Sequence, residues 1–264
     1  MFDYIKKKLG KNKTVAAVYH RVKHHSISER QFREEFNQFS VLSGSKPQRF
    51  SIRWSDRYPC LDERTPFTDF DHHYIYHLAW AARILSQAKP AFHVDISSSL
   101  QFCTMLSAFM PVRFFDYRPA QIILPDLTLD HADLTSLPFE DNCINSLSCM
   151  HTVEHIGLGR YGDKLDPDGD LKAISELKRV LAPGGNLLFV VPVGKPKIMF
   201  NAHRIYSYDQ IVSYFSDLKL INFTLIPDNA IKNAVINNAT SEDVDRQDYG
   251  CGCFWFTREK GPNL

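Results

Sequence analysis

Residues 92–99 read Phe-His-Val-Asp-Ile-Ser-Ser-Ser, an apolar run that ends on an acid and continues into a loop of small residues. A second run, Val-Arg-Phe-Phe-Asp at 112–116, also ends on an acid, and Asp133 ends a third. A fourth run ends in Cys-Met-His-Thr-Val-Glu-His at 149–155. Acids and loops that follow successive strands along one sheet edge are typical of nucleotide-binding α/β domains. The stretch therefore predicts such a domain.

Strands and helices are expected to alternate from Pro90 onward. We expect strands at 92–95, 112–115, 129–132, 144–149 and 187–193, and helices at 100–108, 170–181 and 207–216. The run at 187–191 is apolar on both faces, which is typical of a strand covered by helices on both sides. Segments 220–226 and 254–257 should complete the sheet, the last one as an antiparallel strand. The predicted fold class is α/β, a Rossmann-like doubly wound sheet.

The residues before Pro90 have a different composition. Four apolar residues at helical spacing, Phe32, Phe36, Phe39 and Leu42, predict one helix, and 77–85 predict another. We expect residues 1–90 to form an N-terminal helical cap and arm, and residues 91–264 to form the sheet domain. Residues 1–25 carry seven lysines or arginines against one acid. Such a segment is either solvated or a peripheral contact with a membrane or protein.

Overall composition excludes several classes of protein. The 264 residues carry 31 basic and 30 acidic side chains, and a net charge of +1 argues against a nucleic-acid partner. No apolar run approaches the roughly 20 residues that span a bilayer, and the start lacks the apolar core of a signal peptide, so a cytoplasmic location is expected. The six cysteines show no CxxC spacing. Cys251-Gly252-Cys253 is either a redox or metal pair or the start of a strand.

The order of these features resembles the class I methyltransferases that use S-adenosylmethionine. The resemblance covers roughly residues 90–225 and includes the acids, the motif at 151–155 and Pro-Gly-Gly at 183–185. More narrowly, segments 157–163, 165–170 and 200–206 resemble the domain of unknown function 268 family. That family resemblance implies a setting among enzymes of bacterial surface polysaccharides, and hence a sugar, glycan or other small-molecule acceptor.

The acids have roles that can be stated physically. Asp116 lies 21 residues after Asp95, at the spacing where an acid accepts hydrogen bonds from both ribose hydroxyls. Asp95 would hold the loop or the methionine amino group. Asp133 would accept from the adenine amino group, and the backbone at Leu134 would bind an adenine ring nitrogen. An acid that ends a strand is also an ordinary turn residue.

Serines stand where such loops carry glycines. A serine forced into a left-handed conformation costs roughly 1 kcal/mol, because its Cβ crowds the backbone. The hydroxyls of Ser97 and Ser99 are candidate donors to the cofactor carboxylate. The other interpretation is a fold that has lost its cofactor and acts as a binding or scaffold protein.

The histidine motif allows more than one chemistry. His155 and His203 are the candidate bases for a hydroxyl acceptor, with His151 and Glu154 beside them, and His151 is also a candidate cofactor contact. HxxEH on a helix is the pattern of an inverted zinc peptidase, but glycines at 157 and 159 interrupt any long helix here. The histidines either pack near the cofactor or hold a divalent cation with Glu154, and we assign no metal.

Two segments at the ligand edge are candidates for acceptor binding. The first contributes Arg160, Tyr161 and Asp163, and the second contributes Arg204 and Tyr206. Arginine pairs well with phosphate or carboxylate. The expected function is therefore O-methylation of a sugar or glycan intermediate in surface polysaccharide biosynthesis, with residues 1–90 capping the acceptor site. The sequence does not indicate an oligomeric state.

Overall fold

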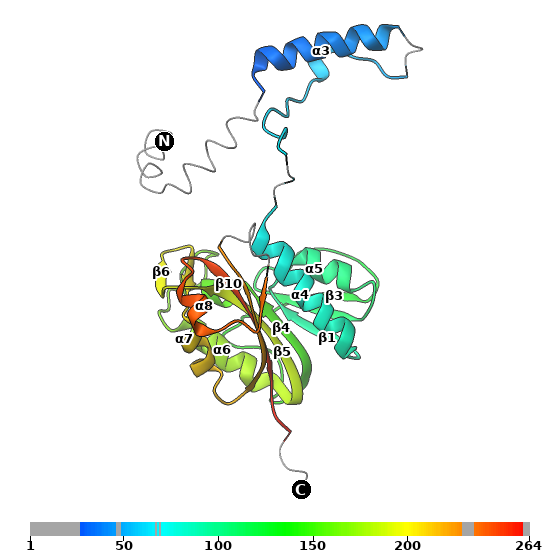
Figure 1. Ribbon diagram of the computed structural model, residues 1–264. Coiled ribbons are helices and arrows are strands. Elements are labelled where there is room, and N and C mark those ends of the chain that lie inside the picture. Colours follow the sequence, from blue (N-terminus) through cyan, green and yellow to red (C-terminus); the bar gives the residue numbers. More distant parts are fainter. Residues whose placement is uncertain (1–26, 46–48, 67, 69, 229–234, 261–264) are drawn as a thin grey trace. The chain divides into compact units, whose positions relative to one another are not determined.

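A computed structural model describes residues 27–45, 49–66, 68, 70–228 and 235–260 (Figure 1). Their contacts divide the chain into two compact units, Met1–Phe70 and Asp71–Leu264, and each unit is described by itself. The basic segment at residues 1–25 lies outside the described residues, so its contact with a membrane or protein stays a prediction. None of the described helices is long and apolar enough to cross a membrane.

The first unit pairs one helix with a tryptophan. The predicted helix is present as α3 (Glu29–Gly44), and η1 (Trp54–Asp56) follows it. Phe36 packs edge-on against the indole of η1, with 4.9 Å between the ring centroids. Arg33 and Arg57 lie over the same ring at 4.6 and 4.5 Å, within the range of cation–π attraction. No residue of α3 is buried.

The second unit contains an eight-stranded sheet in the order β3-β2-β1-β4-β5-β10-β8-β9. The strands are β1 (His93–Ile96), β2 (Val112–Asp116), β3 (Leu127–His131), β4 (Ile144–Met150), β5 (Leu181–Val193), β8 (Lys219–Ile226), β9 (Ile236–Asn237) and β10 (Gly250–Thr257). β1 to β5 pair in parallel, and β10 runs antiparallel between β5 and β8. The predicted Rossmann-like fold class is therefore confirmed.

Helices cover both faces of this sheet (Figure 1). They are α4 (His72–Ala88), α5 (Leu100–Leu106), α6 (Gly169–Val180), α7 (Tyr208–Tyr214) and the short α8 (Ser241–Asp245). Along β5, Leu187, Phe189 and Val191 join the core under α6 and α7, while Leu188 and Val190 join the core under α4 and α5. This period of two is the pleat of a strand with both faces buried, as the sequence predicted.

β5 begins six residues before its predicted start. Its first residues, Leu-Ala-Pro-Gly-Gly at 181–185, form an irregular pairing with β4, where Ile144 pairs with Leu181 and Ser146 already pairs with Asn186. At Gly185 a Cβ would lie 2.9 Å from the Ile144 carbonyl oxygen, so this approach requires glycine. The glycines thus shape the first part of the strand.

α4 packs on the sheet of the second unit. Its residues Leu78, Ala81, Ile84 and Leu85 are buried against α5, β2 and the middle of the sheet. Burying three large aliphatic side chains contributes on the order of 6 kcal/mol, as an upper bound. The structure therefore divides the chain between Phe70 and Asp71, whereas the sequence prediction placed residues up to 90 in a cap. A capping role for the first unit stays a prediction.

The position of the site follows from the strand order. The chain passes from β1 outward to β2 and β3, then returns to place β4 on the other side of β1. This reversal between β1 and β4 is the point where open α/β sheets bind ligands at the strands' carboxyl ends. Two short elements there were not predicted: η2 (Val153–His155) and the hairpin of β6 (Lys197–Met199) and β7 (His203–Ile205).

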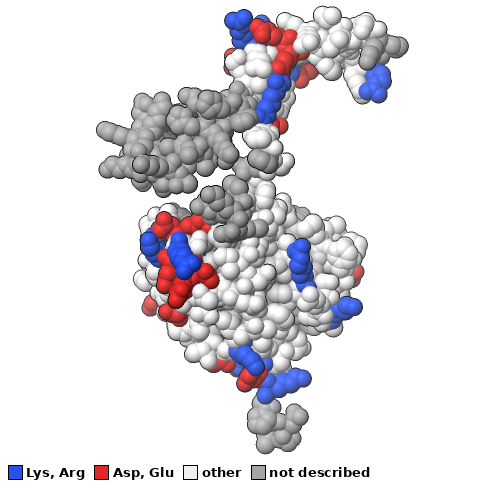
Figure 2. Space-filling view, in the orientation of Figure 1, with Lys and Arg blue, Asp and Glu red and all other residues white. Residues whose placement is uncertain are grey.

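Charged side chains are unevenly spread over the sheet unit. Figure 2 shows acidic side chains gathered over α8, whose first turn carries Glu242 and Asp243. Acids in a first turn stabilise a helix through its dipole. Much of the remaining face in this view carries no charge.

Candidate functional site

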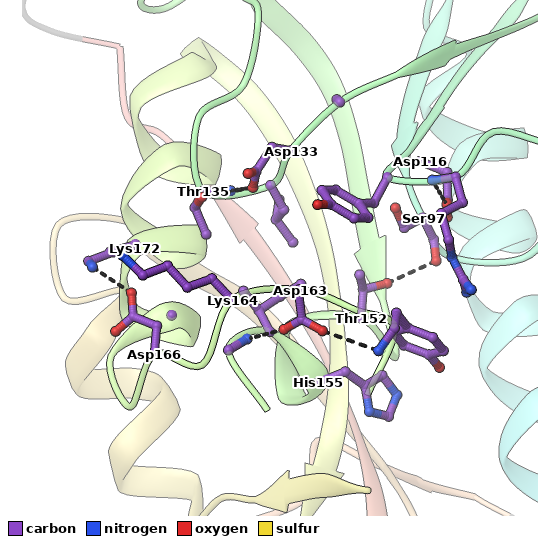
Figure 3. Close-up of a pocket in the computed structure, with 18 of the residues that line it drawn as sticks. Ser97, Asp116, Asp133, Thr135, Thr152, His155, Asp163, Lys164, Asp166 and Lys172 are labelled. Atoms are coloured by element: carbon purple, nitrogen blue, oxygen red, sulfur yellow. Dashed lines mark hydrogen bonds and ion pairs between the residues drawn. The ribbon is translucent and has the colours of Figure 1, made fainter. Parts of the chain in front are cut away.

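A cavity of about 480 Å³ opens at the carboxyl ends of β1, β2 and β4 (Figure 3). Its volume lies within the roughly 300–1,000 Å³ of ordinary small-molecule pockets. Eight of the residues predicted for the site line it: Ser97, Asp116, Asp133, Leu134, His151, His155, Tyr161 and Asp163. Figure 3 shows Asp116 and Ser97 on one side of the pocket and the Asp166–Lys172 pair on the opposite side.

The serine loop holds its own backbone in a strained conformation. Ser97 has φ 57°, in the left-handed region, so it carries the strain that a glycine would avoid. Its N–H and its hydroxyl both donate to the Phe115 carbonyl, at 2.8 and 3.1 Å. Ser98 Oγ accepts from the Met150 N–H at 3.0 Å. The hydroxyls thus fasten the loop to β2 and β4, and Ser99 is the N-cap residue of α5 without a side-chain cap bond.

Asp95 anchors this loop from inside the protein. It is fully buried; Oδ1 accepts from the Ser98 N–H at 3.0 Å, and Oδ2 accepts from the Ser148 hydroxyl. Because Ser148 uses its hydrogen there, its oxygen accepts from His93 Nε2 at 2.8 Å, and His93 Nδ1 accepts from Ser146 at 2.8 Å. Of the two roles predicted for Asp95, the structure shows the one that holds the loop.

Burial shifts both ionisable ends of this chain of hydrogen bonds. It raises the pKa of Asp95 to about 6, although bonds from Ser148 and Ser98 oppose the shift. It lowers the pKa of His93 to about 3. Both directions reflect the cost of placing a charge in a low-dielectric interior.

Asp116 and Asp133 lie at the pocket, each with one carboxylate oxygen engaged. Asp116 Oδ1 accepts from the Arg118 N–H at 2.7 Å. Asp133 Oδ1 accepts from the N–H and the hydroxyl of Thr135, at 2.8 and 2.7 Å. No described residue donates to the second oxygen of either acid, so both can accept a ligand hydroxyl or amine. Leu134 is buried beside Asp133.

The motif after β4 is an irregular turn. His151 has φ 55° and places Nδ1 2.9 Å from Glu154 Oε1. Burial raises the pKa of Glu154 to about 7 and lowers that of His151 to about 4. His155 Nδ1 donates to the Ala202 carbonyl at 2.6 Å, while Nε2 lies 3.8 Å from Glu154 Oε1. Burial also lowers the pKa of His155, although Glu154 opposes that shift.

The first predicted acceptor segment closes one wall of the pocket. Tyr161 lies under two guanidinium groups, with Arg118 at 4.7 Å and Arg160 at 5.1 Å from its ring centroid. Asp163 accepts from the backbone N–H groups of Gly157 and Tyr161, at 2.8 and 3.2 Å. Burial opposes its ionisation, but these bonds outweigh burial and hold its pKa below the ordinary value. Asp163 therefore shapes the loop that presents Tyr161.

The second predicted acceptor segment does not present its charged groups to a ligand. Arg204 is 5% exposed and donates to the carbonyls of Ile156 and Pro167, at 2.7 and 3.1 Å. Tyr206 is 3% exposed and donates to Asp170 at 2.9 Å. Both side chains brace the loop between η2 and α6, which corrects their prediction as acceptor contacts. Burial lowers the pKa of His203, and this histidine does not line the pocket.

Several residues that line the pocket are not among those predicted from the sequence. They are chiefly the cations Arg118, Lys164 and Lys172 and the hydroxyl residues Thr135 and Thr152. Thr152 donates to the Ser97 carbonyl at 2.9 Å and so links the loops after β1 and β4. Arg118 is the one most easily predicted from the sequence, because it follows the acid that ends β2 by two residues, and loops after strand-ending acids face the ligand.

Comparison with known proteins gives a match of one family model to part of the chain and a set of similar solved structures. Residues 135–236 match the domain of unknown function 268, described as a Caenorhabditis protein of unknown function. That description does not support the predicted bacterial polysaccharide setting. None of the curated proteins is similar enough to this sequence to match it.

Among solved structures, the YcgJ protein from Bacillus subtilis is 15% identical, with TM-score 0.49, over 71% of this chain and 100% of that chain. A TehB-like S-adenosylmethionine-dependent methyltransferase from Corynebacterium glutamicum is 16% identical, with TM-score 0.46, over 71% and 98%. The 1,6-didemethyltoxoflavin-N1-methyltransferase of Burkholderia thailandensis, solved with S-adenosylhomocysteine, is 10% identical, with TM-score 0.48, over 70% and 79%. All three TM-scores lie below 0.5, and the fold assignment rests on the strand order itself.

Proposed function

We propose that the pocket between β1 and β4 binds S-adenosylmethionine and that the chain is a methyltransferase. The observation that carries this proposal is the pair of acids Asp116 and Asp133 at the reversal of strand order, each with one oxygen free to accept. In doubly wound sheets, the acid after β2 is placed to accept from a ribose diol. We assign Asp133 and the Leu134 backbone, which line the same pocket, to the adenine.

The residues of the pocket fit such a ligand. Its volume suits a nucleoside with a short tail, and it supplies acceptors for hydroxyl and amino groups. The cofactor carboxylate needs a cationic or hydrogen-bonding partner. The predicted Ser97 hydroxyl is taken by the Phe115 carbonyl, so we assign that role to Arg118 or Lys164, which line the same pocket.

The chain's own residues would then align the acceptor and remove a proton. S-adenosylmethionine supplies a methyl group that its sulfonium already activates. The protein therefore needs to orient the acceptor, exclude water and accept the proton of an attacking hydroxyl. His155 suits the last task, because its Nδ1 hydrogen is held by the Ala202 carbonyl and leaves the Nε2 lone pair free. His203 is the weaker candidate, since it does not line the pocket.

The proposed acceptor is a hydroxyl of a sugar or glycan intermediate. Tyr161 offers its phenol hydroxyl, and Arg160 adds an exposed cation for a phosphate or carboxylate on the acceptor. Biosynthesis of a surface polysaccharide is the setting implied by sequence resemblance, and neither the fold nor the matched family adds support to it.

Calorimetric titration with S-adenosylhomocysteine tests the cofactor site. Asp116→Asn keeps an acceptor for the Arg118 N–H but removes the charge, so affinity should fall about 10- to 100-fold. The matched control is Asp130→Asn on β3, an exposed acid outside the pocket, which should bind as the unmodified protein does. If the unmodified protein binds no S-adenosylhomocysteine, the proposal is wrong.

That last outcome would favour a scaffold protein. The observation on its side is the strained Ser97 loop, whose hydroxyl is used internally. If the cofactor binds, methyl transfer to nucleotide sugars and defined oligosaccharides tests the acceptor. His155→Gln should lower turnover with an accepted sugar. Its affinity for S-adenosylhomocysteine should stay within about threefold of that of the unmodified protein, since the imidazole acts only in proton transfer. Failure of every sugar acceptor with a binding-competent protein would argue against the glycan proposal alone.

A further inference from the structure

A cluster of nitrogen and sulfur ligands lies where α4, the end of β4 and β10 meet. His73 comes from α4, His151 from the turn after β4 and Cys251 from β10. Their ligand atoms all lie within 4.8 Å of one another. The His73 and His151 rings stack at 5.7 Å, and the His77 ring meets the His151 ring edge-on at 5.0 Å. Three elements far apart in the sequence thus place three good metal ligands together.

In this cluster, lone pairs that can accept a hydrogen bond outnumber the hydrogens that can be donated. His77 Nδ1 donates to the His73 carbonyl at 2.6 Å, and its buried Nε2 has no partner among the described residues. With Glu154 ionised, His151 Nδ1 donates to Oε1 at 2.9 Å, which leaves the His151 Nε2 lone pair 3.4 Å from Cys251 Sγ. Glu154 Oε2 is buried and has no partner in the described part of the chain.

Such a surplus is costly. A buried polar atom without a partner costs roughly 1–3 kcal/mol, and a buried carboxylate costs more. The Cys251 thiol has one hydrogen and can satisfy one acceptor at most. A cation in the cluster would engage the His151 Nε2 lone pair, and its charge would balance that of Glu154.

We propose that His73, His151 and Cys251 bind one Zn²⁺ ion, with Glu154 as a positioning residue. Neutral imidazole and thiolate are the ligands that zinc prefers, and tetrahedral zinc bonds of about 2.0–2.1 Å to nitrogen and 2.3 Å to sulfur set those two ligand atoms about 3.6 Å apart. The His151 and Cys251 ligand atoms are already at 3.4 Å. Adjustment of the His73 side chain, in the first turn of α4, closes the remaining separations.

Glu154 completes the arrangement seen around protein zinc. A metal-binding histidine usually donates its other ring nitrogen to a carboxylate, which fixes the tautomer and makes the imidazole a better ligand. The bond from His151 Nδ1 to Glu154 provides this contact. Binding forms the zinc–sulfur bond and releases the thiol proton to solvent.

The ligand count indicates an open zinc site. Three protein ligands leave the fourth position for water or an oxygen of a small molecule, unlike a closed structural site. His151 also lines the proposed cofactor pocket, so the ion would lie at its wall. Zinc binding does not depend on S-adenosylmethionine binding, and each proposal can fail alone.

Metal analysis of the unmodified, full-length protein is the first test. After removal of metal with a chelator and titration with Zn²⁺, we expect one ion per chain and a higher melting temperature. Co²⁺ bound in place of zinc should show the charge-transfer absorption of a cobalt–thiolate bond. Absence of stoichiometric binding, or a cobalt spectrum without a thiolate band, overturns the proposal.

Two pairs of variants locate the ion. Cys251→Ala should lower zinc affinity at least about 100-fold, whereas Cys253→Ala, a buried thiol on the same strand, should not change it. His73→Gln should behave like Cys251→Ala, with the neighbouring His72→Gln as its control. Glu154→Gln should weaken binding about 10- to 100-fold.

Other outcomes count against the site. If His72→Gln or Cys253→Ala reduces binding as much as its partner variant, the ion is held elsewhere. If Cys251→Ala does not fold, His73→Gln and the cobalt spectrum of the unmodified protein still decide. If His73→Gln binds zinc as the unmodified protein does, His151 and Cys251 share only a thiol–imidazole hydrogen bond.

Discussion

Single residues in unusual backbone conformations mark the proposed cofactor site. Ser97 and His151 both have positive φ, and both line the pocket. A residue other than glycine persists in that region only where its surroundings hold it there. Ser97 is held by two hydrogen bonds that it donates to the Phe115 carbonyl, and by one that the Thr152 hydroxyl donates to the Ser97 carbonyl.

Replacement of Ser97 should separate strain from hydrogen bonding. Ser97→Ala loses the hydroxyl bond and keeps the strain, and should cost about 1 kcal/mol in the free energy of unfolding. Ser97→Gly loses the same bond but relieves the strain, so it should be more stable than Ser97→Ala by about 0.5–1 kcal/mol. Ser98, which lacks a positive φ, is the control, and there alanine should be at least as stable as glycine. Urea unfolding measures the stability of all four variants. If glycine were more stable than alanine at both positions, or at neither, strain at Ser97 would not explain the difference.

Arg204 is expected to matter for stability. Its guanidinium donates to three carbonyls of the loop between η2 and α6 and lies 3.5 Å from buried Asp170. An ammonium cannot reach these groups at once, so Arg204→Lys should cost about 3–5 kcal/mol in unfolding free energy. Arg160→Lys, an exposed change nearby, should stay within about 0.5 kcal/mol. Thermal unfolding without ligand measures both, and a small effect of Arg204→Lys would return this residue to the acceptor-binding candidates.

At the scale of elements, long periodic segments were predictable and short ones were not. The strand at 187–193 and the helix at 170–181 are predicted from the sequence because their apolar patterns extend over several residues. β6 and β7 have three residues each, too few to show a period, so their hairpin was missed. Without this hairpin, the sequence predicts Arg204 and Tyr206 as ligand contacts. The role of a charged residue cannot be predicted when the short element that buries it is not predicted.

The contact between β5 and β10 gives a prediction for a whole element. Gly252 pairs with Val191 of β5, and an added Cβ would lie 2.6 Å from Val193 Cγ1 of β5 and 2.8 Å from Phe254 Cε2 of β10. Both neighbours are buried, so Gly252→Ala should cost about 1–3 kcal/mol through overpacking. Gly44→Ala in α3 meets nothing within 4 Å and should be neutral or slightly stabilising. Circular dichroism during thermal unfolding should show a loss of several degrees for Gly252→Ala only.

At the scale of the whole molecule, periodicity located the helices but not the units to which they belong. The pattern at 77–85 predicted a helix, and that helix is part of α4. Only its packing under the sheet shows that it belongs to the second unit, because an apolar stripe does not identify its partner. The same limit hid the zinc ligands, since His73, His151 and Cys251 come together only after α4, β4 and β10 are in place.

The pH dependence of overall stability should reveal the buried chain from His93 to Asp95. The pKa of His93 is about 3 in the folded protein and about 6.5 when unfolded, so its stabilising contribution is complete above pH 6.5 and declines as pH falls. The pKa of Asp95 is about 6 when folded and about 3.9 when unfolded, so its contribution grows as pH falls from 6 towards 4. The two slopes are opposite, and they offset each other in the unmodified protein.

Each variant should remove the slope of the residue that is replaced. Between pH 7 and pH 5, the unmodified protein should lose about 2 kcal/mol relative to His93→Gln and gain about 1 kcal/mol relative to Asp95→Asn. Glutamine and asparagine keep hydrogen-bonding groups near Ser148. Any change in packing therefore alters the unfolding free energy equally at pH 7 and pH 5, and it cancels when the two pH values are compared. Urea unfolding at the two pH values measures the differences. Differences of the same sign for the two variants, each taken relative to the unmodified protein, would show that burial does not set the charge states of His93 and Asp95.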